Sequence, residues 1–511
     1  MSRLRRQVYF DNNATTNISR PVRKRIDRVL KQHYGNPSSL YGIARQSAAV
    51  LEDAREVVAT TLNAQANEIF FVGCASEANN HVLQTLSDAF YPKRRKIVCS
   101  PIEHPSIMSC LEYLGGRGVE VEFLPVDGEG RVRVESLEQM IDSDTFLVCC
   151  MLANNEIGTI QDVGRIADIS KQHGVLAMSD CVQALGKIEV DVRRLGIDYA
   201  TFSAHKLHGP KGIGALFVRE GAPFRPLIHG GHQEAGMRAG TEAVHNAAGF
   251  AEACKDVGRL LSKADETAAR KRLFVDELAK LKPDIAINSP AEACLPNTAS
   301  ITFPGFNNAL MMAALDSRGV AVSAGSACST AETKPSHVLK AIGLSDQQAD
   351  ETIRFSISEQ TSLRDVRYVV GALRDHLEGR TPAIRTLPPA QVDENFLFDE
   401  GNYILDIRFW HERKLLKSLP NSFEASFIGF GRYLQQLPRD KHILVVCMSG
   451  VDAIIAAHTL RSRGFEHLSV LRAGVAGWRF RQPELYRRHA GVNVTRLVPG
   501  LPPRRRARDS S

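Results

Sequence analysis

Short apolar runs alternate with longer amphipathic stretches from about residue 68 to residue 202. The short runs fit strands because turn residues bound them, and the longer stretches between them have the periodicity of helices. A repeated strand–helix order predicts an α/β fold with a large, mostly parallel sheet covered by helices on both faces. Ligands bind such sheets at the carboxyl ends of the strands, so polar residues that follow the strands are the candidate functional groups.

The pattern changes twice along the 511 residues. A large domain is expected over about 15–260. A smaller α+β domain follows over about 261–378, completed by the N-terminal segment, and a long helical stretch over 241–281 leads into it. The proline-containing segment 379–394 has the composition of a stiff linker. A second, small α/β pattern occupies 395–490, and a basic tail occupies 491–511.

Composition excludes several classes of protein. No apolar run approaches the roughly 18–20 residues of a membrane span, and the polar residues that follow Val8–Phe10 rule out a signal-peptide core. We therefore expect a cytoplasmic protein. The cysteines show no Cys-x-x-Cys pair and no zinc-like spacing, so no metal is expected. The arginines near both ends are interpreted as solvated tails, with a weak nucleic-acid contact as the alternative.

A lysine in the segment 203–214 is the first candidate for chemistry. Lys206 follows a strand-like run and precedes a cluster of glycines. A partly desolvated lysine in a fixed place can form a Schiff base with pyridoxal phosphate. Ser203 and His205 can hydrogen-bond a phosphate, and glycines let the backbone approach it closely. A basic surface turn is the simpler interpretation of this segment alone.

Further candidates follow other strand-like runs. Asp180 can pair with the pyridine nitrogen of the cofactor, which keeps the ring an electron sink, and Gln183 can hydrogen-bond the ring hydroxyl. Ala75 and Ser76 open a helix whose N-terminus suits a phosphate. A turn, a helix cap or a solvated helix face is the alternative for each of these residues.

Two more polar groups complete the set of candidates. His104 lies in a loop from which its ring can stack on the cofactor, although a solvated or capping histidine is the plainer interpretation. Asn155 follows the apolar run 146–152. Both residues come after strands, so both are expected at the same edge of the sheet as Lys206.

Together these motifs resemble the NifS-type cysteine desulfurases, which are pyridoxal-phosphate-dependent members of aminotransferase class V. The resemblance covers about residues 7–378, with the motifs in family order. The matching segments are Cys74–Asn80, Glu103-His104, Asn154–Gly158, Asp180 with Gln183, Ser203–Lys206, Gly230–Thr241 and Ser323–Ser329. The loop 72–76 and Tyr41 depart from the family pattern, and the first departure weakens one hydroxyl contact to the phosphate.

The resemblance implies a pyridoxal-phosphate fold of type I and a role for each candidate. Lys206 would carry the Schiff base, and His104 would stack on the ring that Asp180 and Gln183 contact. Thr241 would reach the phosphate bound by a neighbouring subunit, which implies a homodimer. The phosphate ligands would be Ala75, Ser76, Ser203 and His205, and the residues that hold the substrate carboxylate would be Asn155 and Arg354.

The resemblance also implies the reaction. Cys328, in a loop of small polar residues, would take the sulfur of L-cysteine as a persulfide and leave L-alanine, with Lys206 as the base. The long run 330–340 after it resembles the subgroup that passes sulfur to scaffold or carrier proteins. A selenocysteine lyase and a sulfur-carrier scaffold are the alternatives. The final acceptor stays open among iron–sulfur clusters, thiolated tRNA, a cofactor and modified DNA.

The C-terminal pattern resembles a rhodanese domain through Leu405–Arg408, Val445–Val451 and Leu471–Trp478. Cys447 matches the cysteine that starts the anion-binding loop of that family. The loop departs from the family pattern, and Asp452 in particular is expected to raise the pKa of the thiol. Two interpretations follow: Cys447 relays sulfur from Cys328, or the domain is a catalytically weakened docking module.

Overall fold

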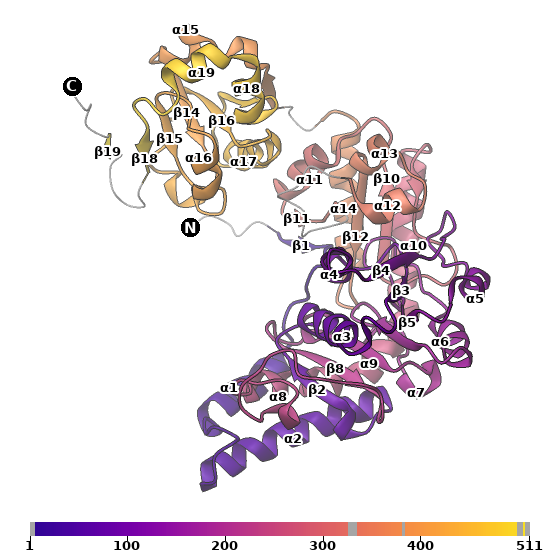
Figure 1. Cartoon of the computed structure of the whole chain (residues 1–511). Coiled ribbons are helices and arrows are strands. Elements are labelled where there is room, and N and C mark those ends of the chain that lie inside the picture. Colours follow the sequence, from indigo (N-terminus) through magenta and orange to yellow (C-terminus); the bar gives the residue numbers. More distant parts are fainter. Residues whose placement is uncertain (1–5, 325–334, 381–383, 498–503, 506–511) are drawn as a thin grey trace. The chain divides into compact units, whose positions relative to one another are not determined.

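The structure is a computed structural model that describes residues 6–324, 335–380, 384–497 and 504–505 (Figure 1). The chain forms two compact units. The first unit comprises Tyr9–Pro304 and Ser323–Val366, and the second comprises Met1–Val8, Gly305–Val322 and Arg367–Ser511. None of the helices in the described part of the chain combines the length and the hydrophobicity that a membrane crossing requires.

A seven-stranded sheet is the centre of the first unit, in the order β2–β8–β7–β6–β5–β3–β4. Its neighbouring strands are parallel except where β8 pairs with β2 and β7, so the predicted mostly parallel sheet is confirmed. The strands are β2 (Ile69–Val72), β3 (Lys96–Cys99), β4 (Glu120–Phe123), β5 (Thr145–Cys149), β6 (Leu176–Asp180), β7 (Tyr199–Ser203) and β8 (Gly214–Val218).

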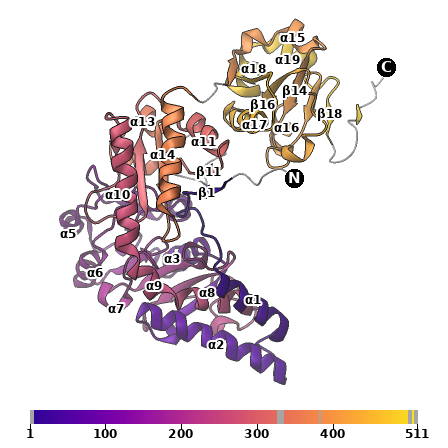
Figure 2. The same cartoon turned by 180° about the vertical axis from the view of Figure 1, so that it is seen from behind.

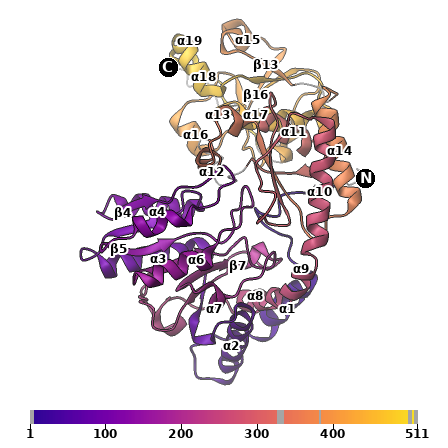
Figure 3. The ribbon, with the colours of Figure 1, turned by 90° about the vertical axis from the view of Figure 1, so that its right-hand side faces the viewer.

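Helices cover both faces of this sheet because side chains alternate along each strand. Ile97 and Cys99 pack with α3 (Ala75–Phe90) and α4 (Pro105–Gly115). Val98, between them, packs on the opposite face with α6 (Val163–Gln172). On that same face, near β2 and β8, α1 (Arg20–Gln32), α2 (Gly42–Leu62) and α8 (Val244–Cys254) pack together (Figure 3).

The expected long helix over 241–281 is instead three helices: α8, α9 (Val257–Ser262) and α10 (Ala264–Leu281). The helix breaks at Asp256 and again at Lys263, whose backbone N–H bonds to the carbonyl of Leu260. The remaining helices of the first unit are α5 (Leu137–Met140), α7 (Val192–Leu195), α12 (His337–Ala341) and α13 (Asp346–Asp350).

A small antiparallel sheet also belongs to the first unit, with β10 (Thr298–Thr302) between β9 (Ala286–Ile287) and β12 (Thr352–Ser356). Helix α10 packs on this sheet (Figure 2). Phe274 of α10 lies edge-on to Phe355 of β12, with ring centroids 4.9 Å apart. Strand β12 carries Arg354 and so joins this sheet to the candidate site.

The second unit contains a sheet in the order β13–β17–β16–β14–β15–β18–β19, parallel except for its last pair. Its strands are β13 (Arg385–Leu387), β14 (Asn402–Asp406), β15 (Ser422–Glu424), β16 (His442–Val446), β17 (Leu468–Leu471), β18 (Thr495–Arg496) and β19 (Arg504–Arg505). The helices around this sheet are α15 (Glu394–Phe398), α16 (Trp410–Leu415), α17 (Val451–Ser462), α18 (Gly474–Arg481) and α19 (Pro483–His489).

The second sheet extends beyond the boundaries expected from the sequence. Strand β13 lies inside the predicted linker 379–394 and pairs with β17. Trp478 is fully buried, and its indole N–H donates to the carbonyl of Val392 at 2.8 Å, which ties the same segment to the core. Part of the predicted linker therefore belongs to the folded sheet. The unit also includes α11 (Asn308–Asp316) and β11 (Val320–Ala321), whereas β1 (Val8–Tyr9) and α14 (Leu363–Leu377) cross the division between the units.

Candidate active site

The carboxyl ends of β2, β3, β5, β6 and β7 surround a cavity of about 250 Å³ in the first unit. Every residue that the sequence analysis assigned to the cofactor or the substrate lines this cavity, except Thr241. Those residues are Ala75, Ser76, His104, Asn155, Asp180, Gln183, Ser203, His205, Lys206 and Arg354. The parallel strands therefore bring together side chains that are far apart in the sequence.

Lys206 ends the short 3₁₀ turn Ala204–Lys206 that follows β7. Its Nζ donates to the carbonyl oxygens of Asn13 at 2.5 Å and Ala14 at 2.9 Å. The turn closes tightly because Gly209 has no side chain: a Cβ there would lie 2.7 Å from the carbonyl oxygen of Ala204. The amine is thus fixed at the cavity wall, as a Schiff-base lysine requires.

Asp180 is the last residue of β6 and is 4% exposed. One carboxylate oxygen accepts from the side-chain amide of Asn79 at 3.0 Å, and the other accepts from the backbone N–H of Val182 at 3.0 Å. The side-chain oxygen of Asn79 accepts from the hydroxyl of Thr201 at 2.7 Å, so the side-chain amide of Asn79 is held in one orientation. A buried carboxylate held in this way suits a protonated pyridine nitrogen.

His104 caps helix α4. The backbone N–H of Ser106 donates to its Nδ1 at 3.2 Å, so the ring proton lies on Nε2. Burial and the charges of Lys206 and His337 lower the pKa of His104, whereas the charge of Asp180 opposes this shift. A neutral, oriented imidazole therefore stands at the cavity wall.

The residues expected to bind the phosphate meet at the N-terminus of α3. Its free N–H groups and its helix dipole favour an anion. Ala75 and Ser76 open this helix, and Ser203 and His205 reach the same cavity from the end of β7. Burial and the neighbouring lysine charges, that of Lys206 first, lower the pKa of His205 to about 4, so its ring is neutral at pH 7.

Pyridoxal phosphate fits this set of groups. The cavity presents an amine for the aldehyde, a carboxylate for the ring nitrogen, and a helix N-terminus with hydroxyls for the phosphate. The backbone of β8 also packs closely against the N-terminus of α3. A Cβ on Gly214 would lie 2.9 Å from the carbonyl carbon of Cys74 and 3.0 Å from the nitrogen of Ala75. The residues present therefore match the cofactor that the sequence predicts.

The residues expected to hold the substrate carboxylate have partners that the sequence did not reveal. Arg354 is 2% exposed, so it is not a surface residue. Its Nη2 lies 2.7 Å from the carboxylate of Asp11, and its Nη1 donates to the carbonyl of Asn155 at 3.1 Å. A substrate carboxylate that binds here would share this guanidinium with Asp11.

Asn13 is the main residue of the site that the sequence analysis missed. Its backbone carbonyl accepts from Lys206, and its side-chain amide donates to Thr298 at 2.8 Å and to the carbonyl of Asn155 at 3.1 Å. Its side-chain oxygen accepts from Lys187 at 3.0 Å. The only signal in the sequence was the polar turn that follows the first short strand.

Glu103, next to His104, belongs to a matching segment, but the sequence assigned it no role. It is fully buried, and its Oε1 accepts from the backbone N–H of Met151 at 2.6 Å. Burial raises the pKa of Glu103 to about 8, and the charge of Asp180 adds to this shift. Glu103 is therefore mostly protonated at pH 7 and adds little negative charge beside Asp180.

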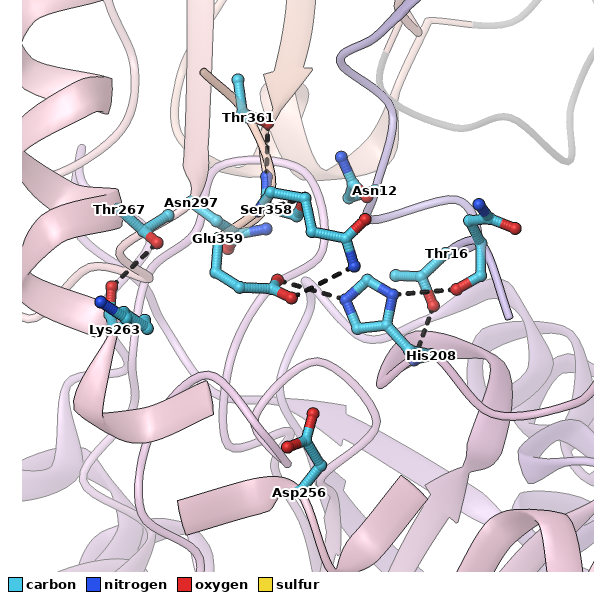
Figure 4. Close-up of polar contacts among 12 residues, drawn as sticks. Asn12, Thr16, His208, Asp256, Lys263, Thr267, Asn297, Ser358, Glu359 and Thr361 are labelled. Carbon is cyan, nitrogen blue, oxygen red and sulfur yellow. Dashed lines mark hydrogen bonds and ion pairs between the residues drawn. The ribbon is translucent and has the colours of Figure 1, made fainter. Parts of the chain in front are cut away.

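His208 lies beside a smaller cavity of about 40 Å³ that Lys206 also lines. Figure 4 shows its ring between Glu359 and the segment that contains Thr16. Nε2 is 3.3 Å from the carboxylate of Glu359, and Nδ1 is 2.9 Å from the carbonyl of Asn17. Both partners accept hydrogen bonds, so both nitrogens must carry protons and the ring is an imidazolium.

The other predicted residues lie elsewhere. Thr241 is exposed and lines a separate cavity of about 230 Å³ with Gly73 and Arg238. Cys328 lies outside the described residues. Cys447 belongs to the second unit, is 2% exposed and accepts from the backbone N–H of Gly450 at 3.0 Å.

A cavity that joins these groups at the edge of a mostly parallel sheet defines the first unit as a pyridoxal-phosphate enzyme of the α/β class. The chain belongs to the aminotransferase class-V family, because residues 8–369 match that family. Residues 389–480 match the rhodanese-like domain.

Similar proteins extend these matches. A "Cysteine desulfurase IscS" from Dictyoglomus turgidum is 36% identical over 387 residues, which cover 76% of this chain and 97% of that protein. A protein of the same name from Methanosarcina thermophila is 35% identical over 364 residues, which cover 71% of this chain and 90% of that protein. The alignments span almost the whole of these relatives.

Solved structures agree with the sequence matches. A "NifS-like protein" has a TM-score of 0.69 and 38% identity, covering 73% of this chain and all of that chain. The structure of DndA from Streptomyces lividans has a TM-score of 0.58 and 30% identity, covering 68% of this chain and 98% of its own. The fold expected from the resemblance is therefore confirmed.

Proposed function

We propose that this chain is a pyridoxal-phosphate-dependent cysteine desulfurase that converts L-cysteine into L-alanine and carries the sulfur as a persulfide on Cys328. The observation that carries the proposal is the single cavity lined by Lys206, Asp180 and His104 in a class-V aminotransferase fold. Relatives that carry the name cysteine desulfurase support the choice of substrate.

The side chains have separate tasks in this reaction. Pyridoxal phosphate supplies an electron sink for the substrate carbon when bound. Lys206 takes the α-proton of the amino acid, and Arg354 with Asn155 orients its carboxylate. The thiolate of Cys328 attacks the substrate sulfur, so an S–S bond forms as the C–S bond breaks. The electron pair of that bond stays with the three-carbon fragment, which gains a proton and leaves as alanine.

Several finer assignments belong to this proposal. A homodimer follows if Thr241 reaches the phosphate bound by a second subunit, and the match to a rhodanese-like domain supports transfer of sulfur to an acceptor protein. The acceptor pathways that remain open are iron–sulfur cluster assembly, tRNA thiolation, cofactor synthesis and DNA modification, and we expect the enzyme in the cytoplasm. Identification of the protein that becomes labelled by radioactive sulfur from cysteine tests them.

The direct test is the Cys328→Ala variant. We expect it to lose both alanine and sulfide production, because no thiolate accepts the sulfur, while the visible absorbance of the bound cofactor stays unchanged. Amino-acid analysis, a sulfide assay and absorbance spectra measure these outcomes. Cys294→Ala removes a cysteine away from the cavity and should behave as the wild type. Turnover that persists in Cys328→Ala contradicts the assignment of the nucleophile.

A further inference from the structure

A second lysine, Lys187, lies close to the amine of Lys206 in the first unit. It is partly buried in the loop that follows β6. Its Nζ donates to the side-chain oxygen of Asn13 at 3.0 Å and to the side-chain oxygen of Gln183. Both contacts are to amide oxygens, so they need only two N–H groups, which an amine has whether or not it is protonated.

The contact to Gln183 decides which end of its amide faces the cavity. An amide can turn over, because its oxygen and nitrogen ends have almost the same shape. Lys187 satisfies the oxygen end. The nitrogen end donates to the carbonyl of Asn13 at 3.0 Å, and this same carbonyl accepts from Lys206 at 2.5 Å. Lys187, Gln183 and Lys206 thus share Asn13 as their common partner.

One N–H of the Gln183 amide goes to Asn13, and the amide carries a second N–H. Gln183 lines the cavity that fits the cofactor. The second N–H is therefore the natural donor to a group bound there. If the amide turned over, its oxygen would face the carbonyl of Asn13, and two acceptors would repel each other.

We propose that Lys187 is a positioning residue: it holds the Gln183 amide with its nitrogen toward the cofactor site and toward the carbonyl shared with Lys206. The inference rests on the proposed use of pyridoxal phosphate and goes beyond it, because it concerns a residue that does not line the main cavity. Burial first, and then the charges of Lys206 and Arg354, lower the pKa of Lys187 well below its ordinary value. A lysine with so low a pKa contributes less through its charge than through its hydrogen bonds.

The test is a pH titration of the visible absorbance of the cofactor-bound enzyme. A hydrogen bond donated to the ring oxygen of the cofactor stabilises negative charge there and lowers the pH at which the absorbance changes. Lys187→Met removes both N–H donors at nearly constant volume, so we expect this midpoint to rise by about one unit. Gln183→Leu should raise it by a similar amount.

The double variant separates positioning from a direct charge effect. If Lys187 acts through Gln183, Lys187→Met adds no further shift in the Gln183→Leu background. Two independent, additive shifts overturn the proposal, as does an unchanged midpoint in Lys187→Met. Lys171→Met, an exposed lysine of α6, controls for the replacement itself and should leave the midpoint unchanged.

A second variant and a parallel activity assay separate a folding failure, and a failure of the proposed function, from a failure of this inference. Should Lys187→Met fail to fold, Lys187→Gln keeps a shorter donor and should give a smaller rise in the midpoint, whereas no rise overturns the inference. Alanine production by the wild-type enzyme is assayed in parallel. If the wild type binds pyridoxal phosphate but makes no alanine from cysteine, the proposed function fails while the titration still decides the role of Lys187.

Discussion

His208 illustrates at the scale of one residue how a buried charge makes stability depend on pH. Burial lowers its pKa, but the hydrogen bond and the charge of Glu359 outweigh this effect and raise it above 6.5. For Glu359, burial raises the pKa, and the contacts with His208 overcome this to lower it to about 2. The carboxylate is therefore charged at every pH of interest, and the protonation of His208 controls the pair.

The direction in which stability changes with pH follows from the difference between the folded and unfolded pKa values. A group whose pKa is raised in the folded state stabilises the protein fully below its unfolded pKa, near 6.5, and this contribution disappears as the pH rises through the folded value. We expect Glu359→Gln to lower the free energy of unfolding by about 3 kcal/mol at pH 6, because it breaks a buried ion pair. The loss should be smaller at pH 9 than at pH 6, because the contribution of His208 disappears as the pH rises through its raised pKa.

Denaturant unfolding of wild type and variant at both pH values measures this difference. Glu292→Gln is a matched control, because Glu292 is exposed. It should change the stability little at either pH. An equal loss for Glu359→Gln at pH 6 and pH 9 means that His208 does not carry the charge assigned to it.

The contrast between Lys206 and Asn13 shows what sequence can predict for single residues. Lys206 and Asp180 could be found because each follows a strand and belongs to a motif with a chemical purpose. Asn13 acts through contacts to Thr298 and Lys206, which lie far along the chain and meet it only in the folded protein. The pairing of Asp11 with Arg354 depends in the same way on long-range packing.

At the scale of elements, β8 and α3 meet at a glycine. Gly214 begins β8, and a Cβ there would lie 2.6 Å from the carbonyl oxygen of Phe202 and 2.9 Å from the carbonyl carbon of Cys74. These are backbone atoms, so Gly214→Ala must displace β8 or the N-terminus of α3. Overpacking of this kind costs about 1–3 kcal/mol, so we expect the dissociation constant of the cofactor to rise about tenfold.

Titration of the apoenzyme with pyridoxal phosphate, followed by absorbance, gives this constant. Gly258→Ala is the control, because no atom lies within 4 Å of a Cβ at that place in α9. It should leave cofactor binding unchanged and stabilise the helix by up to about 1 kcal/mol. Equal affinities for wild type and Gly214→Ala would mean that this close approach does not shape the phosphate site.

The same scale shows where sequence patterns stop being informative. Strand–helix alternation predicted the sheet, because burial on both faces leaves a clear hydrophobic pattern. The division of 241–281 into α8, α9 and α10 left no such trace, since no proline marks either break. Helix α1 was not predicted, although Val22, Ile26 and Val29 recur at helical spacing and could have revealed it.

At the scale of the whole molecule, one chain combines a class-V aminotransferase region with a rhodanese-like domain. The rhodanese-like domain takes part in sulfur transfer only if Cys447 can carry a persulfide. Burial raises the pKa of its thiol, and the charge of Asp452 adds to the rise, whereas backbone N–H groups of Ala453, Gly450 and Ser449 oppose it. The thiolate is the reactive form, so a high pKa slows sulfur capture.

Asp452→Asn removes the negative charge that raises the pKa of Cys447, so it should lower this pKa by about half a unit to one unit. If Cys447 relays sulfur, this change increases its thiolate fraction several-fold and speeds the appearance of a persulfide on Cys447 after cysteine is added. Peptide mass spectrometry over time measures this rate, with Asp440→Asn, an exposed carboxylate of the same unit, as the control. Cys328→Ala should abolish the label, because the relayed sulfur comes from that residue. A Cys447 that stays unlabelled in both wild type and Asp452→Asn contradicts the relay and leaves docking as the role of the domain.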